Sequence, residues 1–536
     1  MPDHERIRTA PKSVEISRTP REPESDPTLG IGVTTASGGP TAHRLVTIGD
    51  SLTHGFMSGA IHRTDLSWPA IVAFEMGLRA DEFTFPVYEW PTGPGGLPFD
   101  LERLARGFND RFGDRLDFWE VFSAVAWVRK YMDKIEDHWE RDDGAGRPEG
   151  GPPLHNMAVY GWDLVDALVL NTAIVEDRIV PPGDDFLAQF VENHGSRAAW
   201  PVVQRAREGT DGSPRTVFEA AVEMGEQDGG IETLVVALGA NNALGSVLSL
   251  EPSWTPDNYL ETPLQDRLET KREYNVWQPP HFAEEWARVV AELQRVNARH
   301  VILTTIPAVT IAPIARGVAG KVRPQSRYFP HYTRPWITDN DFDPDRDPCL
   351  NELEARAIDS AIDAYNHTII ASVRTAREQN LDWYLFDMGG LLDRLAVRRY
   401  IQSPWTRPAW WTPYELPAAL QQLEPLPNTR FFRADKSGRT DGGLISLDGV
   451  HPTTIGYGLV AQEIIKIMQL AGVTFQTRDG TARAGDVQVD FARLIASETL
   501  LNDPPAAISN TLGLLGWLDE RLDWINRILP FMPNPL

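Results

Sequence analysis

A short apolar run meets a turn and a serine in the stretch Arg44-Leu-Val-Thr-Ile-Gly-Asp-Ser-Leu-Thr-His-Gly55. The apolar part, residues 45–48, is rich in β-branched side chains, which is typical of a buried strand. Gly49-Asp50 is a turn signal, and Ser51 follows it directly. Ligands bind at the carboxyl ends of strands in open α/β folds, so Ser51 is a candidate nucleophile. The alternative is an ordinary strand-to-loop turn that holds a serine.

Other apolar runs have the same character, and helical stretches separate them. The runs are residues 156–161, 233–238, 300–306 and 383–386. Strands that alternate with helices favour a parallel sheet that is covered on both faces. The sequence therefore predicts an α/β fold with a five-stranded parallel sheet.

The remaining segments suggest how the 536 residues are divided. Residues 1–43 are rich in Pro, Arg, Glu and Ser and lack an apolar signal-peptide core, so we expect a disordered tail and a cytoplasmic protein. Residues 44–475 form the predicted α/β domain, with long insertions near 56–153 and 400–443. Residues 476–536 are expected to form a helical extension. No run of eighteen apolar residues predicts a membrane-spanning helix.

Composition narrows the classes of partner. The formal net charge is −24, which disfavours nucleic acids and anionic membranes as general partners. Cys349 is the single cysteine, so an intrachain disulfide is excluded. The acidic loop 339–347 has Pro344 where a calcium loop needs glycine, and we predict no metal site there.

A base for Ser51 is offered by the short segment Asp448-Gly-Val-His-Pro452. A serine hydroxyl becomes a good nucleophile when a histidine accepts its proton and a third group orients that histidine. The loop is short enough for Asp448 and His451 to face each other, and Pro452 suits the first turn of the following helix. The alternative is a simple turn with a surface histidine. His54 has no paired carboxylate, so we expect it to line the site or form a hydrogen bond.

An oxyanion hole needs hydrogen-bond donors at the point where negative charge develops. Asn241 and Gly161 each follow a predicted strand, as Ser51 does. The Asn241 amide, the Gly161 N–H and the Ser51 N–H are therefore the candidate donors. Asn and Gly are also common in ordinary turns, which is the alternative interpretation.

Together these segments resemble the SGNH hydrolase superfamily, also called GDSL esterases and lipases. The resemblance rests on four blocks in the family's order: residues 49–52, 156–161, 239–242 and 448–452. It implies a flavodoxin-like, three-layer α/β/α fold, a Ser51–His451–Asp448 triad, and an oxyanion hole of Ser51, Gly161 and Asn241. Asn242 stands where the family usually has Asp, and the two long insertions are unusual.

The resemblance implies a serine esterase or lipase that forms an acyl-enzyme on Ser51 without a cofactor. Its substrate would be a small-molecule, lipid or sugar ester. Alternatives are an acyltransferase or phospholipase with the same triad, or a catalytically silent binding protein. The aromatic insertion carries Trp405, Trp410 and Trp411, which either wall the substrate cleft or only pack the insertion onto the domain.

Overall fold

The computed structural model describes residues 9–34, 39–88, 95–113, 121–146, 151–179, 191–203, 213–323 and 325–505, together with 513, 516, 518 and 519. At its centre lies a parallel sheet of five strands in the order β10-β6-β5-β1-β4. The strands are β1 (His43–Gly49), β4 (Asn156–Ala158), β5 (Ile231–Ala237), β6 (Ala298–Thr304) and β10 (Trp383–Phe386). The prediction of a five-stranded parallel sheet is confirmed.

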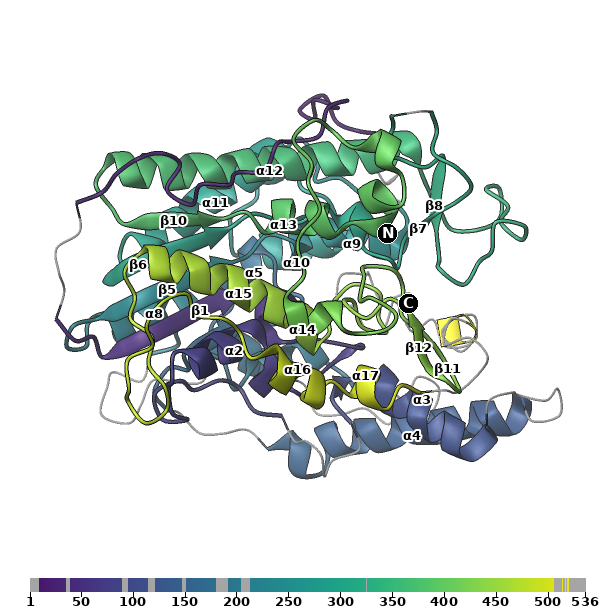
Figure 1. Ribbon diagram of the computed structural model, residues 1–536, viewed down its shortest axis with the longest axis horizontal. Coiled ribbons are helices and arrows are strands. Elements are labelled where there is room, and N and C mark those ends of the chain that lie inside the picture. The colour runs from purple at the N-terminus through teal and green to yellow at the C-terminus, as the bar shows by residue number, and fades with distance from the viewer. Residues whose placement is uncertain are drawn as a thin grey trace.

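Helices cover both faces of this sheet (Figure 1). On one face, Val46, Val236 and Leu303 pack against α8 (Val217–Gly225), α11 (Pro279–Leu293) and α12 (Glu352–Glu378). On the other face, Val235 and Ile302 pack against α2 (Trp68–Glu75) and α15 (Thr454–Leu470). Successive strand residues point to opposite faces of the sheet, and helices cover both faces. Residues of both orientations are therefore apolar, which explains the continuous apolar runs in the sequence.

The register of the strands brings three loops to one edge of the sheet. Gly49 is paired with Ala158 on β4 and with Ala237 on β5. The segments that follow these residues begin α1 (Ser51–His54), the turn at Gly161 and α9 (Asn241–Ser249). Because carboxyl ends of parallel strands share an edge, the candidate residues become neighbours.

The long segment between β1 and β4 contains two helices that pack together, α3 (Leu101–Phe112) and α4 (Val121–Glu140). After β4 the chain forms two short helices, α5 (Leu164–Val169) and α6 (Thr172–Arg178), with a break between them. Asn171 caps α6 through its side chain, which accepts hydrogen bonds from the N–H groups of Ala173 and Ile174.

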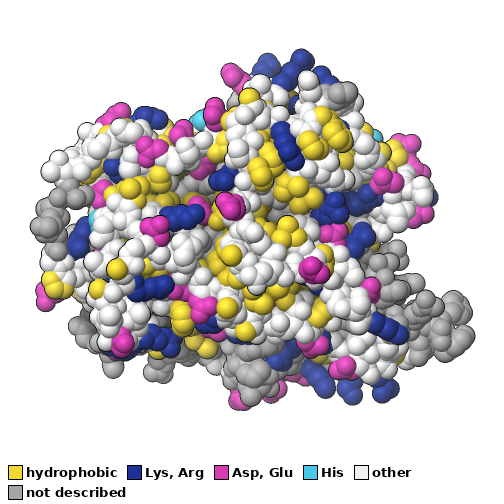
Figure 2. All heavy atoms as spheres, viewed as in Figure 1, with side chains coloured by type: hydrophobic (Ala, Val, Ile, Leu, Met, Phe, Trp, Pro, Cys, Tyr) yellow, Lys and Arg dark blue, Asp and Glu magenta, His cyan; other side chains and the backbone are white. Residues whose placement is uncertain are grey.

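The segment between β10 and α15 is also ordered. It contains α13 (Met388–Leu395), α14 (Ala418–Gln421) and a hairpin of β11 (Arg433–Asp435) and β12 (Gly438–Asp441). Hydrophobic side chains gather on the face of the molecule that carries α13, α14 and α15 (Figure 2).

The N-terminal segment differs from the disordered tail that its composition predicted. Residues 9–34 lie along the domain, where Figure 1 shows them passing beside α12. Val14 is buried in the core, and Arg21 forms two hydrogen bonds with the Asp387 carboxylate, at 2.9 and 2.6 Å. The Pro27 carbonyl accepts a hydrogen bond from the Leu385 N–H on the edge strand β10. Specific polar contacts therefore hold a segment whose composition is poor in apolar residues.

The C-terminal extension is described as far as residue 505, apart from four later residues. It includes α16 (Phe491–Ser497) and α17 (Thr499–Asn502), and α16 packs on α15. The rest of the helical extension expected over 476–536 lies outside the described residues. In the described part of the chain, no helix is long and apolar enough to cross a bilayer.

Candidate active site

Ser51, His451 and Asp448 form a continuous hydrogen-bonded chain. His451 Nε2 lies 2.8 Å from Ser51 Oγ, and His451 Nδ1 lies 3.0 Å from Asp448 Oδ2. Because Asp448 accepts the proton of Nδ1, the Nε2 atom of neutral His451 is free to accept the Ser51 hydroxyl proton. The three side chains are at most 4% exposed. The structure therefore brings together the triad residues that the sequence suggested.

Ser51 is presented by the turn at the end of β1. It is the first residue of α1, and the Asp50 carboxylate caps that helix by accepting a hydrogen bond from the Leu52 N–H at 3.0 Å. Burial raises the pKa of Asp50 to about 7. This carboxyl group is thus less readily ionised than an ordinary aspartic acid.

The Asp448 carboxylate is held by backbone donors as well as by His451. The N–H groups of Val450 and His451 bind Oδ1 at 2.9 Å, and the N–H of Gly59 binds Oδ2 at 3.0 Å. Burial alone would disfavour the charge, but His451 and these hydrogen bonds lower the pKa of Asp448 below its ordinary value. The carboxylate therefore stays ionised beside the histidine.

Gly59 is a site residue that the sequence reasoning missed. Its φ is +78°, and a Cβ at this position would lie 2.8 Å from the Phe99 carbonyl oxygen. The neighbouring Ser58 N–H donates to Ser446 Oγ at 2.8 Å. The loop after α1 therefore holds the Asp448 loop in place, although Gly59 and Asp448 are 389 residues apart in the sequence. In the sequence, this loop is indicated locally only by the Ser58-Gly59 pair, because glycine readily adopts a positive φ.

The candidate oxyanion donors lie at the ends of neighbouring strands. Gly161 has a φ of +82°, a conformation that favours glycine, and it follows β4. The Asn241 side-chain amide donates to the Trp162 carbonyl at 2.7 Å, which ties α9 to the Gly161 turn. An amide nitrogen has two hydrogens, so the same group can donate a second bond to a substrate oxygen. Asn242 is buried beside it, and its Oδ1 accepts from the Leu164 N–H at 3.4 Å.

His54 is buried behind the Gly161 turn and forms hydrogen bonds, as expected. Its Nδ1 accepts from the Tyr160 N–H at 3.1 Å, so Nε2 carries the proton and donates to the Tyr88 hydroxyl at 2.9 Å. The Tyr88 hydroxyl donates in turn to the Ala198 carbonyl. Burial lowers the pKa of His54 to about 3, so the ring is neutral. Its contacts fix the peptide that precedes Gly161.

An apolar pocket opens beside Ser51 and His451. The pocket walls come from α2, α9, α13, α15 and the loop after β6, and among them are Trp68, Leu244, Ile311, Leu391, Leu395 and Val460. Thr429 and Leu444 bring the segment before the Asp448 loop into the same wall. Apart from Ser51 and His451 the lining is almost entirely hydrocarbon, which suits an acyl chain. Most of these residues had no sequence signal that distinguished them from core.

The sequence left a cleft role and a packing role open for the three tryptophans of the insertion. Trp411 is buried, packs on Tyr400, and its Nε1–H donates to the Asp393 carbonyl at 2.9 Å. Trp410 lies against the same Tyr400 ring, and Trp405 is 61% exposed. None of the three is in the lining of the pocket beside Ser51. This placement favours the packing interpretation for Trp410 and Trp411.

Comparison with models of known protein families gave no match, and comparison with curated proteins gave no match either.

Proposed function

We propose that the protein is a serine esterase or lipase of the SGNH hydrolase type. The observation that supports this most directly is the Ser51–His451–Asp448 chain at the wall of an apolar pocket. The site carries this proposal, because a parallel α/β sheet hosts many unrelated activities.

In the proposed reaction, Ser51 Oγ attacks the ester carbonyl carbon while His451 Nε2 takes its proton. The carbonyl oxygen becomes negatively charged and is stabilised by the Asn241 amide and the N–H groups of Gly161 and Ser51. His451 then gives its proton to the leaving alcohol, and an acyl-enzyme forms. Water, activated by His451, releases the carboxylic acid. Asp448 holds the histidine tautomer throughout.

The test is covalent labelling with a fluorophosphonate, together with hydrolysis of p-nitrophenyl esters of increasing acyl length. Ser51→Ala should abolish labelling and hydrolysis while the protein stays folded. Ser437→Ala, in the turn of the β11–β12 hairpin, is the matched control and should change neither. Labelling and activity that survive in Ser51→Ala would reject the proposal.

Two alternative functions are open to test. The first uses the same triad, and the second involves no catalysis. An acyltransferase would pass the acyl group to an alcohol instead of water, so the products formed with a non-water acceptor distinguish it. A silent binding protein would show no labelling of Ser51. The short Ser51–His451 distance argues for an active triad.

A further inference from the structure

One wall of the apolar pocket is the helix α13. The side chains of this helix that line the pocket are Met388, Leu391, Leu392 and Leu395. They recur at helical spacing, so they form one face of α13. The position of α13 therefore determines how wide the pocket is beside Ser51.

The face of α13 that points away from the pocket contacts the N-terminal segment, residues 9–34. A Cβ at Gly390 would lie 2.7 Å from Pro23 Cβ, and a Cβ at Gly389 would lie 3.3 Å from Arg21 Nη2. The two glycines lack side chains, and this lets the two segments approach each other so closely. The N-terminal segment therefore lies directly against the back of the pocket wall.

Arg21 fixes the start of this helix through Asp387. The Asp387 side chain caps α13 by accepting a hydrogen bond from the Gly390 N–H at 2.9 Å. Arg21 donates two hydrogen bonds to the same carboxylate, at 2.9 and 2.6 Å, and the Glu24 N–H donates another at 2.7 Å. Burial alone would raise the pKa of Asp387, but the Arg21 guanidinium and these hydrogen bonds hold it below its ordinary value. The cap of α13 is therefore an ionised carboxylate paired with Arg21.

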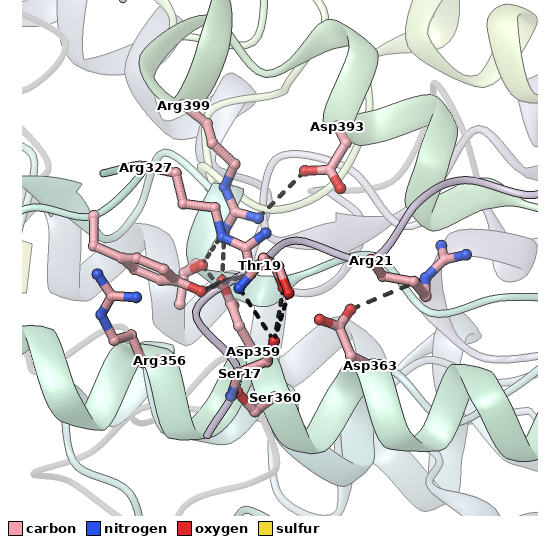
Figure 3. Close-up of polar contacts among 12 residues, drawn as sticks. Ser17, Thr19, Arg21, Arg327, Arg356, Asp359, Ser360, Asp363, Asp393 and Arg399 are labelled. Carbon is pink, nitrogen blue, oxygen red and sulfur yellow. Dashed lines mark hydrogen bonds and ion pairs between the residues drawn. The ribbon is translucent and has the colours of Figure 1, made fainter. Parts of the chain in front are cut away.

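Contacts with α12 hold this part of the N-terminal segment in place. Arg21 lies 4.0 Å from the Asp363 carboxylate, and the Ser17 N–H donates to Ser360 Oγ at 3.0 Å. Figure 3 shows Ser17, Thr19 and Arg21 following one another along α12, with Arg21 turned toward Asp363. Because α12 packs on the central sheet, Arg21 fixes the start of α13 relative to the body of the domain.

The end of α13 is held by other partners. The Asp393 carboxylate lies 3.2 Å from the Arg399 guanidinium, and the Asp393 carbonyl accepts a hydrogen bond from Trp411 Nε1 at 2.9 Å. Figure 3 shows Asp393 and Arg399 turned toward each other. Without Arg21, the first turn of α13 loses its cation, whereas the last turn keeps its partners. We therefore expect a local change in the pocket wall.

We propose that Arg21 is a specificity-determining residue, which sets the acyl-chain preference by positioning α13 as a wall of the pocket. Arg21 is not in the pocket lining and acts through Asp387. This inference rests on the proposed esterase function, and it names the substrates as esters whose acyl chain is long enough to lie along α13. It gives the N-terminal segment, whose composition predicted a disordered tail, a role in substrate selection.

The first experiment compares p-nitrophenyl octanoate with p-nitrophenyl acetate, using the full-length protein at a temperature at which every variant is folded. One methylene in an apolar pocket changes kcat/KM by about 10- to 200-fold. A wall that has moved away from the chain should therefore lower the octanoate-to-acetate ratio of kcat/KM by about tenfold in Arg21→Met. An acetyl group buries little hydrocarbon, so kcat/KM for the acetate ester should stay within about twofold.

Matched variants separate positioning from stability. Arg18→Met, at an exposed position of the same segment, should change kcat/KM for neither ester. Arg21→Lys keeps the charge but loses the fork of two hydrogen bonds, so its ratio should be intermediate. Because Arg21 acts through Asp387, adding Arg21→Met to Asp387→Asn should lower the ratio little further than Asp387→Asn alone. A purely stabilising role would reduce kcat/KM for both esters alike, and that result would overturn the proposal.

The second experiment needs no catalysis. The neutral fluorophore N-phenyl-1-naphthylamine is titrated into the full-length protein. Val460→Trp fills the pocket, so the binding that this variant loses belongs to the pocket. Arg21→Met should weaken that binding, because the wall of the pocket has moved, and Arg18→Met should leave it unchanged.

The outcomes distinguish the two proposals. Hydrolysis of both esters through Ser51, with an unchanged ratio in Arg21→Met, overturns the role of Arg21 and leaves the esterase intact. If Arg21→Met does not fold, Arg21→Lys decides in the same way. A protein that cleaves neither ester, and whose Ser51 is not labelled, rejects the esterase. Binding of the fluorophore then decides on the wall, and equal binding in wild type and Arg21→Met overturns it.

Discussion

The proposed oxyanion hole is where we expect single residues to make the sharpest difference. Asn241→Ala should lower kcat by about a hundred- to a thousandfold, because one donor to the developing charge is removed. Asn242→Ala is the matched control. It removes a buried side chain one position along and should affect stability more than kcat. Kinetics with a p-nitrophenyl ester measure kcat of the two variants, and thermal melting measures their stability. Reversed effects would place the oxyanion hole on Asn242.

His54 is predicted to position the hole without acting as a base. His54→Leu leaves the Tyr160 N–H without its acceptor, so kcat should fall by about tenfold. His54→Asn places an acceptor near the same position and should restore part of the rate. The rise of kcat/KM with pH should persist in both variants, because His451 is the proposed base. A rise that disappears in His54→Leu and survives in His451→Gln would reverse these roles.

Asp50 should make stability depend on pH. Its pKa is about 7 in the folded state and near 4 in an unfolded chain, so it binds a proton more readily when folded. The contribution of Asp50 to the free energy of unfolding is fully present below pH 4 and is lost as pH rises through 7. It amounts to about 1.4 kcal/mol per unit of pKa difference between the folded and unfolded states. Asp50→Asn keeps the helix cap and should flatten this dependence. Urea unfolding between pH 4 and 8 measures it, and an unchanged slope would contradict the assignment.

Among the elements, the N-terminal segment has the most testable role. Arg21→Met leaves the Asp387 carboxylate buried without its cation, and breaking such a pair typically costs about 3–5 kcal/mol. We expect about 3 kcal/mol, because the Thr305 hydroxyl and the Gly390 N–H still bind Asp387. The free energy of unfolding in urea is the measurement. Arg18→Met, at an exposed position nearby, is the control and should cost little. If Arg21→Met costs as little as the control, this segment does not stabilise the domain.

At the scale of the whole molecule, the apolar pocket is assembled from distant segments, and its size should set acyl-chain preference. Val460→Trp fills the pocket from α15 and should shift kcat/KM toward short p-nitrophenyl esters. Lys466→Trp, exposed on the same helix, should leave the preference unchanged. Trp411→Ala should instead lower the melting temperature and reduce kcat/KM for all substrates alike, because Trp411 packs outside the pocket. A selective effect of Trp411→Ala would restore it to the substrate cleft.

The sequence by itself determined the five strands, the helical character of the segments between them and the residues that we propose as the triad. Strands and helices follow from the period of apolar residues, which is a local property. Ser51 and His451 lie 400 residues apart, yet both could be named because each sits in a short, characteristic turn. The boundary of α12 also has a local cause, since the Asn351 side chain accepts a hydrogen bond from the Glu354 N–H.

Only the tertiary structure decided what surrounds the triad. The Gly59 N–H reaches Asp448, Arg21 pairs with Asp387, and Thr429 joins the wall of the apolar pocket. None of these contacts has a periodic pattern, because each depends on which distant loops pack together. For the same reason, composition predicted a disordered N-terminal tail: it records the scarcity of apolar residues but not the partners that bind a polar segment.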